Sequence, residues 1–442
     1  MAEDDKKPPG PDLTQGIPAA ELAEGGTLVG HVGTDAVLLV RHAGAVSAIS
    51  PECTHYHGPL AEGLVVGGTI RCPWHHACFS LKTGEALAAP AIDPLTCWQV
   101  EERDGKLVVG AKKKMSPPVK TGSPSERVVI IGGGAAGFAA AEMLRRRGYA
   151  GQITMISNDD APPVDRPNLS KDYLAGSAPE DWVPLRGLDW YTENKITLRL
   201  KTEATGLAPK TQTLTLADGS TLAFDKLLLA TGAEPVKLDL PGAGQPHVFM
   251  LRSFDDSRAI IAGAKNAKRA VIIGGSFIGL EVAASLRARD IEVHVVAPEK
   301  RPLERVFGRE LGDFVRALHE EHGVHFHLEN GVTEIGKSSV KLKIGGDIAA
   351  DLVVIGVGVR PRLTLAEKAG LTLDSGVSVN EYLETSAPGI YAAGDIARWP
   401  DPISGQRIRV EHWVVAERQG QVAALNMLGQ PTPFHAVPFF WS

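Results

Sequence analysis

Two cysteines and two histidines in the first hundred residues occur in closely spaced pairs that are typical of metal ligands. Cys53-Thr-His55 is followed, after sixteen residues, by Cys72-Pro-Trp-His75. Each segment offers one thiolate and one imidazole. Two such segments can enclose a structural zinc ion, which accepts two cysteines and two histidines. They can also hold a [2Fe–2S] cluster, with the cysteines on one iron and the histidines on the other. The spacing alone leaves both alternatives open.

Two glycine-rich turns indicate a second kind of chemistry. Each turn lies between an apolar run and an alanine-rich stretch, and their glycines are Gly132, Gly134 and Gly137 in the first turn and Gly274, Gly275 and Gly279 in the second. Glycine lets the backbone turn tightly and approach a pyrophosphate at the start of the following helix. Ser276 replaces the middle glycine of the second motif, which weakens that match. We expect a dinucleotide at each turn.

An acidic residue about 20 positions past each turn is the expected ligand of the adenosine ribose. For the first turn this residue is Asp159, which lies 22 residues past Gly137. Asp159 can also be a solvated loop acid beside Asp160, in which case Asn158 takes the role.

For the second turn the expected ribose ligand is Glu299, 20 residues past Gly279. A carboxylate at this place favours NADH, because it accepts hydrogen bonds from an unmodified ribose. Lys300 and Arg301 follow it directly and would favour the 2′-phosphate of NADPH. We expect NADH in preference to NADPH.

The elements that position these residues divide the 442-residue chain into several domains, since the chain is too long for one hydrophobic core. Residues 13–110 consist of short β-prone pieces and predict an all-β domain. Residues 111–126 are basic and rich in Pro and Ser, as in a linker. The two strand–turn–helix units then predict two doubly wound α/β domains, placed at 127–245 with 374–442, and at 246–373.

Composition excludes several classes of protein. Hydrophobic residues make up 43% and charged residues 22%, as in a globular protein, and the net charge of −6 offers no basic surface for nucleic acid. Four cysteines cannot form a disulfide scaffold. We find no signal peptide and no apolar run of the roughly 20 residues that cross a bilayer. We therefore expect a cytoplasmic protein.

The segments CTHYHGPLAEG and CPWHHACFSLKTGE resemble the two ligand loops of Rieske ferredoxins. The resemblance implies that Cys53, His55, Cys72 and His75 bind a [2Fe–2S] cluster. High-potential Rieske proteins add one cysteine to each loop and join the loops by a disulfide. Gly58 and Trp74 stand at those places here, so the resemblance implies the low-potential, ferredoxin-like group. The other two cysteines, Cys78 and Cys97, are interpreted as packing residues.

The segments LLLATGAEP (residues 227–235) and GIYAAGDIA (residues 389–397) resemble paired motifs of flavoprotein reductases with two dinucleotide domains. The resemblance implies FAD at the first turn, with Thr231, Gly232 and Asp395 as flavin ligands, and the nicotinamide nucleotide at the second turn, with Gly358 beside it. Taken alone, Asp395 is also explained as a helix cap.

Two further segments resemble oxygenase-coupled ferredoxin reductases and apoptosis-inducing factors. DRPNLSKDYL (residues 165–174) implies that Arg166 and Lys171 line the flavin and that Glu281 pairs with Lys171. VEHWVVAERQG (residues 410–420) implies a helix under the flavin, with Glu411 and Trp413 as its neighbours. The alternatives are that Lys171 and Glu281 are unrelated surface charges and that Trp413 belongs to the core.

The order of these parts resembles the Rieske-containing, apoptosis-inducing-factor-like proteins over residues 13–442. That family continues into a third domain where this chain reads VPFFWS, and the two alternatives are a natural difference from the family and a truncated or proteolysed form. The resemblance implies an oxidoreductase that passes electrons from NAD(P)H through FAD to its own cluster and on to an unidentified acceptor. A nucleotide-responsive signalling protein is the alternative. Residues 127–442 contain no cysteine, which excludes disulfide reduction and disfavours a peroxidase or oxidase.

Overall fold

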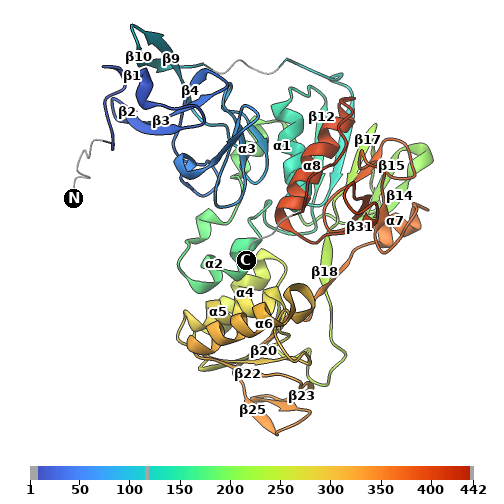
Figure 1. Cartoon of the computed structure of the whole chain (residues 1–442). Helices are drawn as coiled ribbons and strands as arrows, with labels where there is room; N and C mark the ends of the chain where they lie inside the picture. The colour runs from blue at the N-terminus through green and yellow to red at the C-terminus, as the bar shows by residue number, and fades with distance from the viewer. Residues whose placement is uncertain (1–7, 115–118, 439–442) are drawn as a thin grey trace. The chain divides into compact units, whose positions relative to one another are not determined.

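The computed structural model describes residues 8–114 and 119–438 (Figure 1). The chain forms two compact units: one contains the described residues up to Thr121 together with Glu142–Ala150, and the other contains Gly122–Ala141 and the described residues from Gly151 onward. Positions 115–118 of the expected linker and positions 439–442 lie outside the described residues. Each unit has its own hydrophobic core.

The part of the first unit that precedes the linker is an all-β domain, called here the N-terminal unit. Its six-stranded sheet has the order β1-β10-β9-β4-β3-β2, with β1 (Ile17–Pro18), β2 (Thr27–Val32), β3 (Asp35–His42), β4 (Ala45–Ile49), β9 (Cys97–Arg103) and β10 (Lys106–Lys112). Its four-stranded sheet has the order β5-β6-β7-β8, with β5 (Leu64–Val66), β6 (Thr69–Arg71), β7 (Cys78–Ser80) and β8 (Ala86–Ala88). All neighbours in both sheets are antiparallel. The predicted all-β fold of this part is confirmed.

Strand β3 is apolar on both faces because it separates two cores. Leu38 and Val40 face the cluster of buried side chains that includes Cys53 and Cys72. Val37 and Leu39, on the alternate face, pack in a second cluster with Trp98. Strand residues alternate between faces, so a strand buried on both sides reads as one continuous apolar run. The loops that carry the cysteines are thereby anchored on the first core.

The second unit contains two five-stranded parallel sheets. The first has the order β13-β12-β11-β17-β29, formed by β11 (Arg127–Ile131), β12 (Gln152–Ile156), β13 (Ile196–Arg199), β17 (Lys226–Leu229) and β29 (Ile390–Ala392). The second has the order β19-β26-β20-β21-β22, formed by β19 (Val248–Met250), β20 (Arg269–Ile273), β21 (Glu292–Val296), β22 (Val324–His327) and β26 (Leu352–Ile355). Because β29 follows the second sheet in sequence, the second sheet is an insertion into the first domain. The predicted double α/β fold is confirmed.

Helices and short antiparallel elements connect these strands. The helices are α1 (Ala135–Arg146), α2 (Asp172–Ala175), α3 (Leu188–Glu193), α4 (Phe254–Ala264), α5 (Phe277–Arg287), α6 (Glu304–Glu321), α7 (Thr364–Lys368) and α8 (Trp413–Met427). One small sheet contains β14 (Ala204–Ala208), β15 (Thr213–Leu216) and β16 (Thr221–Ala223), and another contains β23 (Val332–Ile335), β24 (Ser339–Leu342) and β25 (Asp347–Ala349). A third contains β28 (Val377–Ser378), β30 (Ala397–Pro400) and β31 (Arg407–Ile408). Strands β18 (Ala233–Pro235) and β27 (Val359–Pro361) pair where the chain leaves and re-enters the first domain.

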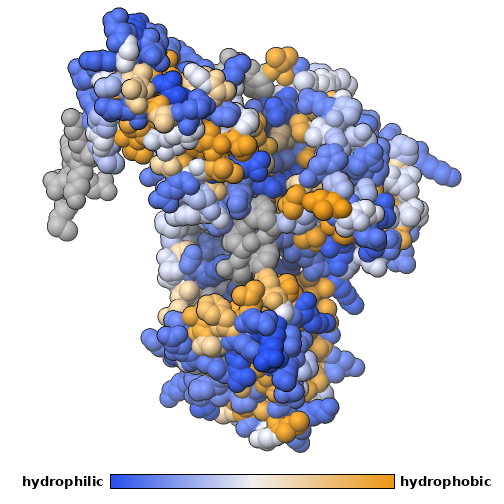
Figure 2. Space-filling model, in the orientation of Figure 1, coloured by the Kyte–Doolittle hydropathy of each residue, from blue (hydrophilic) through white to orange (hydrophobic). Residues whose placement is uncertain are grey.

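Polar and apolar residues are interspersed over the face shown in Figure 2. Within the described ranges, none of the helices combines the length and the apolar character that a membrane crossing requires.

Helix α8 lies beside α1 in Figure 1, and the two backbones are in direct contact. A Cβ on Gly420 would lie 2.1 Å from the carbonyl oxygen of Ala136, so only glycine permits this approach. The close packing buries polar side chains of α8 as well. Glu417 is 2% exposed, and its Oε2 atom has no hydrogen-bond partner among the described residues. Burial and the nearby carboxylate of Asp165 raise the pKa of Glu417 well above its usual value.

This raised pKa predicts a pH dependence of stability. The folded chain retains a proton on Glu417 at pH values where the unfolded chain has lost it. The contribution to the free energy of unfolding is therefore complete below the ordinary glutamate pKa of about 4.3 and is lost as the pH rises through the folded pKa. We expect Glu417→Gln to flatten the profile of unfolding free energy against pH above about pH 5, as measured by urea denaturation. Glu310→Gln, at an exposed position of α6, is the control, and identical profiles for wild type and Glu417→Gln would contradict the assignment.

Candidate functional site

The two cysteine–histidine loops have the same backbone conformation. In Cys53–Gly58 and in Cys72–Ala77, the N–H of the cysteine donates to the carbonyl of the last residue, at 2.9 Å in both loops. The N–H of the fifth residue donates back to the cysteine carbonyl, at 3.0 and 3.1 Å. That fifth residue, His57 or His76, has a positive φ of 58° or 56°. Two matching turns thus present the two metal-binding pairs in equivalent orientations.

The two sulfur donors are buried and face each other. Cys53 is 1% exposed and Cys72 is 2% exposed, and their thiols are within hydrogen-bonding distance. Each sulfur also accepts hydrogen bonds from the backbone N–H groups two and three residues further along its own loop. The hydrogen bond between the two thiols lowers the pKa of Cys72 to about 6, and the same hydrogen bond, together with burial, raises the pKa of Cys53. The backbone N–H groups favour negative charge on both sulfurs, as a thiolate ligand requires.

The two imidazoles form a second pair. The rings of His55 and His75 are 5.1 Å apart between centroids and nearly perpendicular, at 83°. Burial, together with the charge of His75, lowers the pKa of His55 to about 3, so this ring is neutral and able to bind a metal. Its buried Nδ1 atom has no hydrogen-bond partner within the described ranges. An unsatisfied buried nitrogen beside a second imidazole fits a metal ligand.

The pairing of like donors distinguishes the two metal alternatives. A zinc site requires all four donors around one ion. Thiol beside thiol and imidazole beside imidazole instead match the two irons of a [2Fe–2S] cluster with mixed ligands. This arrangement favours the cluster over a zinc ion.

The remaining cysteines, Cys78 and Cys97, are buried, and all four thiols are free. Gly58 adjoins the metal-binding pair, because a Cβ at this position would lie 2.8 Å from the Cys72 sulfur. Trp74 is 53% exposed.

The first glycine-rich turn has the backbone conformation that a pyrophosphate site needs. Gly132 has a φ of 118°, and a Cβ there would lie 2.0 Å from the Ala230 carbonyl oxygen. A Cβ on Gly137 would lie 2.0 Å from the Gly132 carbonyl oxygen, and one on Gly134 would lie 3.3 Å from the guanidinium of Arg166. Side chains are therefore excluded where the backbone must approach a ligand.

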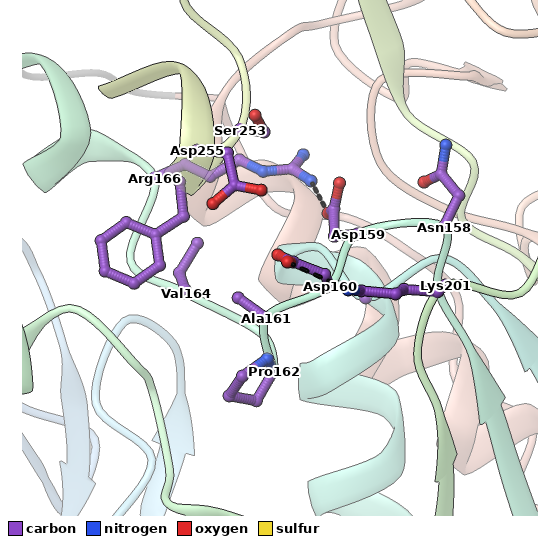
Figure 3. Close-up of a pocket in the computed structure, with 12 residues that line it drawn as sticks. Asn158, Asp159, Asp160, Ala161, Pro162, Val164, Arg166, Lys201, Ser253 and Asp255 are labelled. Carbon is purple, nitrogen blue, oxygen red and sulfur yellow. Dashed lines mark hydrogen bonds and ion pairs between the residues drawn. The ribbon is translucent and has the colours of Figure 1, made fainter. Parts of the chain in front are cut away.

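A cavity of about 390 Å³ opens beside this turn (Figure 3). The guanidinium of Arg166 lies 3.3 Å from the carboxylate of Asp159, and Lys201 lies 3.5 Å from Asp160. Asn158 also lines the cavity, so both residues considered for the ribose lie at its wall. The volume and the mixture of acidic and basic groups suit the polar half of a dinucleotide.

Lys171, between β12 and β13, and Glu281, in α5, form an ion pair. The ammonium of Lys171 lies 3.1 Å from Oε1 of Glu281, and these side chains are 30% and 13% exposed. The hydroxyl of Ser170 donates to the other carboxylate oxygen, at 2.5 Å. Ser285 of α5 in turn donates to the Ser170 carbonyl, at 2.7 Å. The alternative of two unrelated surface charges is wrong, and Ser170 is a partner that the sequence analysis missed.

Asp395 lies in a cluster of arginines. Its carboxylate is 2.8 Å from Arg252, and its carbonyl accepts a hydrogen bond of 2.8 Å from Arg409. Desolvation, with Arg252 as the second cause, lowers the pKa of Arg166 to about 10. A Cβ on Gly232 would lie 3.3 Å from Arg252, so this glycine also keeps space open there. Each of these partly buried arginines has one carboxylate partner, and guanidinium groups gathered in this way suit a diphosphate.

Arg252 is a second residue that the sequence analysis missed. The only local signal is a lone cation between β19 and the N-cap Ser253 of α4.

The other expected flavin ligands have partners within the protein. Thr231 donates its hydroxyl to the carbonyl of Arg362, at 2.9 Å. Glu411 pairs with Arg409 at 2.6 Å, and the Trp413 side chain hydrogen-bonds to Glu417.

The second glycine-rich turn repeats the first. Gly274 also has a φ of 118°, and a Cβ on it would lie 2.3 Å from the carbonyl oxygen of Gly356. A Cβ on Gly279 would lie 2.2 Å from the Gly274 carbonyl oxygen. The hydroxyl of Ser276, at the irregular position of the motif, donates to the Gly356 carbonyl at 2.7 Å. The serine is therefore accommodated without disturbing the turn.

Two more residues expected at this turn follow the strands that flank β20 on either side. Gly358 has a φ of 109° and follows β26, while Glu299 follows β21. The Glu299 side chain is 33% exposed and lies 3.6 Å from Arg305.

Comparisons with known proteins agree with this geometry. The chain matches the pyridine nucleotide-disulphide oxidoreductase family over residues 126–420 and the Rieske [2Fe–2S] domain over residues 15–99. Apoptosis-inducing factor 3 of Homo sapiens is 33% identical over 433 residues, which covers 93% of this chain and 71% of the relative. Rhodocoxin reductase of Rhodococcus erythropolis is 36% identical over 310 residues, which covers 69% of this chain and 73% of that protein.

Among solved structures, the covalent putidaredoxin reductase–putidaredoxin complex contains a similar chain. It is 34% identical, with a TM-score of 0.70, and the match covers 72% of this chain and 79% of that one. The cofactors expected from the sequence, FAD, a nicotinamide nucleotide and a [2Fe–2S] cluster, are confirmed by these matches. The chain therefore belongs to the pyridine nucleotide-disulphide oxidoreductase family, as an FAD-dependent NAD(P)H oxidoreductase that also carries a Rieske [2Fe–2S] domain.

Proposed function

We propose that this chain transfers electrons from NADH through FAD to its own [2Fe–2S] cluster, and from there to an acceptor that remains to be identified. The observation that carries the proposal is the pairing of Cys53 with Cys72 and of His55 with His75 in the same chain as two nucleotide turns. FAD accepts a hydride and releases electrons singly, and the cluster carries one electron. A tethered cluster has a high effective concentration at its reductase.

We propose the following roles for the residues of the second unit. The first turn, the cavity and the arginine cluster bind FAD, through Gly132, Gly134, Gly137, Asp159, Arg166, Thr231, Gly232, Asp395, Glu411 and Trp413. The second turn binds the nicotinamide nucleotide, through Gly274, Gly275, Gly279, Glu299 and Gly358. Lys171 and Glu281 hold the flavin and nicotinamide rings in the relative position that hydride transfer requires. The same proposal divides the chain into domains that comprise residues 13–110, 127–245 with 374–442, and 246–373. It also places the protein in the cytoplasm, a setting that rests on the sequence alone.

The ion pair of Lys171 and Glu281 can perform its role without a proton transfer. Its two charges come from segments far apart in the sequence and are fixed by Ser170, which restricts both side chains. A positioned cation beside a flavin stabilises the negative charge that the ring gains on reduction. Relatives named as ferredoxin–NAD(+) reductase components support this use of the fold.

The route predicts the number of electrons that the holoenzyme takes up. In an anaerobic NADH titration, wild type should accept about three electrons per chain, two at the flavin and one at the cluster. His75→Ala should accept about two, because its cluster site is incomplete. His76→Asn, a change at the neighbouring exposed histidine, is the matched control and should behave as wild type. The route would be contradicted if NADH bleaches the flavin of wild type while electron paramagnetic resonance shows that the cluster stays oxidised. A signalling protein, the alternative function, would reduce ferricyanide only slowly.

The ion pair gives a second prediction. Lys171→Met should lower the rate of flavin reduction by NADH by about 100-fold, since it removes the positioned cation and leaves the Glu281 carboxylate without its ionic partner. Stopped-flow absorbance of the flavin measures this rate. The control is Lys343→Met, at an exposed lysine between β24 and β25. A wild-type rate in Lys171→Met with normal FAD content would show that the pair has no part in the reaction.

A further inference from the structure

Arg301 is one of two cations, with Lys300, that follow Glu299 and could recognise a 2′-phosphate, yet its charged group is occupied. It lies two residues beyond Glu299, the proposed ligand of the adenosine ribose. Its Nε donates to Oδ1 of Asp313 at 2.5 Å, and its Nη1 donates to Oε1 of Glu304 at 3.2 Å. Its side chain is only 13% exposed. Two carboxylates of α6 thus satisfy a guanidinium that would otherwise be available to a nucleotide.

The loop that carries Arg301 lies against the second glycine-rich turn. The N–H of Leu303 donates to the carbonyl of Gly275, at 3.4 Å. A Cβ on Gly275 would lie 3.7 Å from Cα of Pro302. The backbone on both sides of Arg301 is therefore beside the nucleotide turn. An arginine at such a place can bind the 2′-phosphate of NADP when its side chain points toward the ribose.

Helix α6 holds the Arg301 side chain in its present direction. A Cβ on Gly312 would lie 3.2 Å from Cβ of Arg301 and 2.9 Å from the Pro302 carbonyl oxygen. The missing side chain at Gly312 therefore lets Arg301 lie directly on the helix. From there its guanidinium reaches Asp313, the next residue of the helix. Arg301 therefore packs against α6 and also forms ion pairs with it.

We propose that Asp313 is a specificity-determining residue, which withholds Arg301 from the nucleotide so that the site takes NADH in preference to NADPH. The proposal rests on the assignment of the nicotinamide nucleotide to the second turn. The other arginine near the site, Arg305, already faces the Glu299 carboxylate at 3.6 Å. With Arg301 held by Asp313 and Arg305 facing Glu299, a 2′-phosphate would meet the Glu299 carboxylate with only the exposed Lys300 left to offset the repulsion.

Equilibrium binding of NAD⁺ and NADP⁺ to the FAD-loaded protein tests this proposal without turnover. Asp313→Asn removes the charge but keeps the shape. It should lower the ratio of the NADP⁺ to the NAD⁺ dissociation constant by about tenfold, the effect of one charge-assisted hydrogen bond. Adding Arg301→Gln should abolish the gain. Glu304→Gln should shift the ratio in the same direction by less.

The matched control is Glu320→Gln, which breaks the Arg316–Glu320 pair of 2.8 Å on the same helix and should leave the ratio unchanged. An unchanged ratio in Asp313→Asn, with NAD⁺ binding retained, would overturn the role of Asp313 and leave the nucleotide site intact. Failure of wild type to bind either nucleotide would overturn the assignment of the turn itself, and the proposal with it.

Discussion

The ion pair between Lys171 and Glu281 links the segment between β12 and β13 to helix α5, and so connects the parts of the chain that follow the two glycine-rich turns. Lys171 follows the first glycine-rich turn and its cavity, whereas Glu281 belongs to α5, directly after the second turn. The 3.1 Å contact therefore joins the two nucleotide sites at one point. Ser170 and Ser285 add hydrogen bonds beside the pair, so several short interactions hold this segment against α5, with which it also shares a hydrophobic core. A hydride can pass only between rings held a few ångströms apart, which makes such positioning a requirement of the chemistry.

The N-terminal unit holds four metal-binding side chains as two different pairs, one of cysteine sulfurs and one of histidine imidazoles. Its two loops have the same turn, and this repetition places sulfur beside sulfur and ring beside ring. Backbone N–H groups directed at each sulfur stabilise the thiolates. Hydrogen bonds to the sulfurs also set the potential of a cluster, so these loops determine both the ligands and the driving force. The β sheets serve mainly as the support on which the two turns face each other.

Local chemistry was predictable from the sequence, and contacts between distant segments were not. The glycines of both turns and the four metal-binding residues were predictable because each group follows from a short motif. Arg252 and Asp395 are 143 residues apart, and Ser170 and Glu281 are 111 apart, so no local pattern indicates those contacts. The pairing of Lys171 with Glu281 was predicted only through family resemblance. The sequence likewise suggested Arg301 as a phosphate ligand, because the carboxylate that occupies it comes from α6, twelve residues later. The confirmed part is the fold class, the family and the cofactors, while the domain limits and the individual residue roles stay predictions.

The most direct test of the central claim is the order of the reaction that reduces the cluster. The flavin of the oxidised holoenzyme would be reduced rapidly with NADH in a stopped-flow instrument, and the cluster absorbance followed as electrons leave the flavin. Transfer within one chain predicts a first-order rate that does not change over an approximately tenfold range of protein concentration. A rate that rises in proportion to protein concentration would show that the electrons travel between molecules, and would contradict the account.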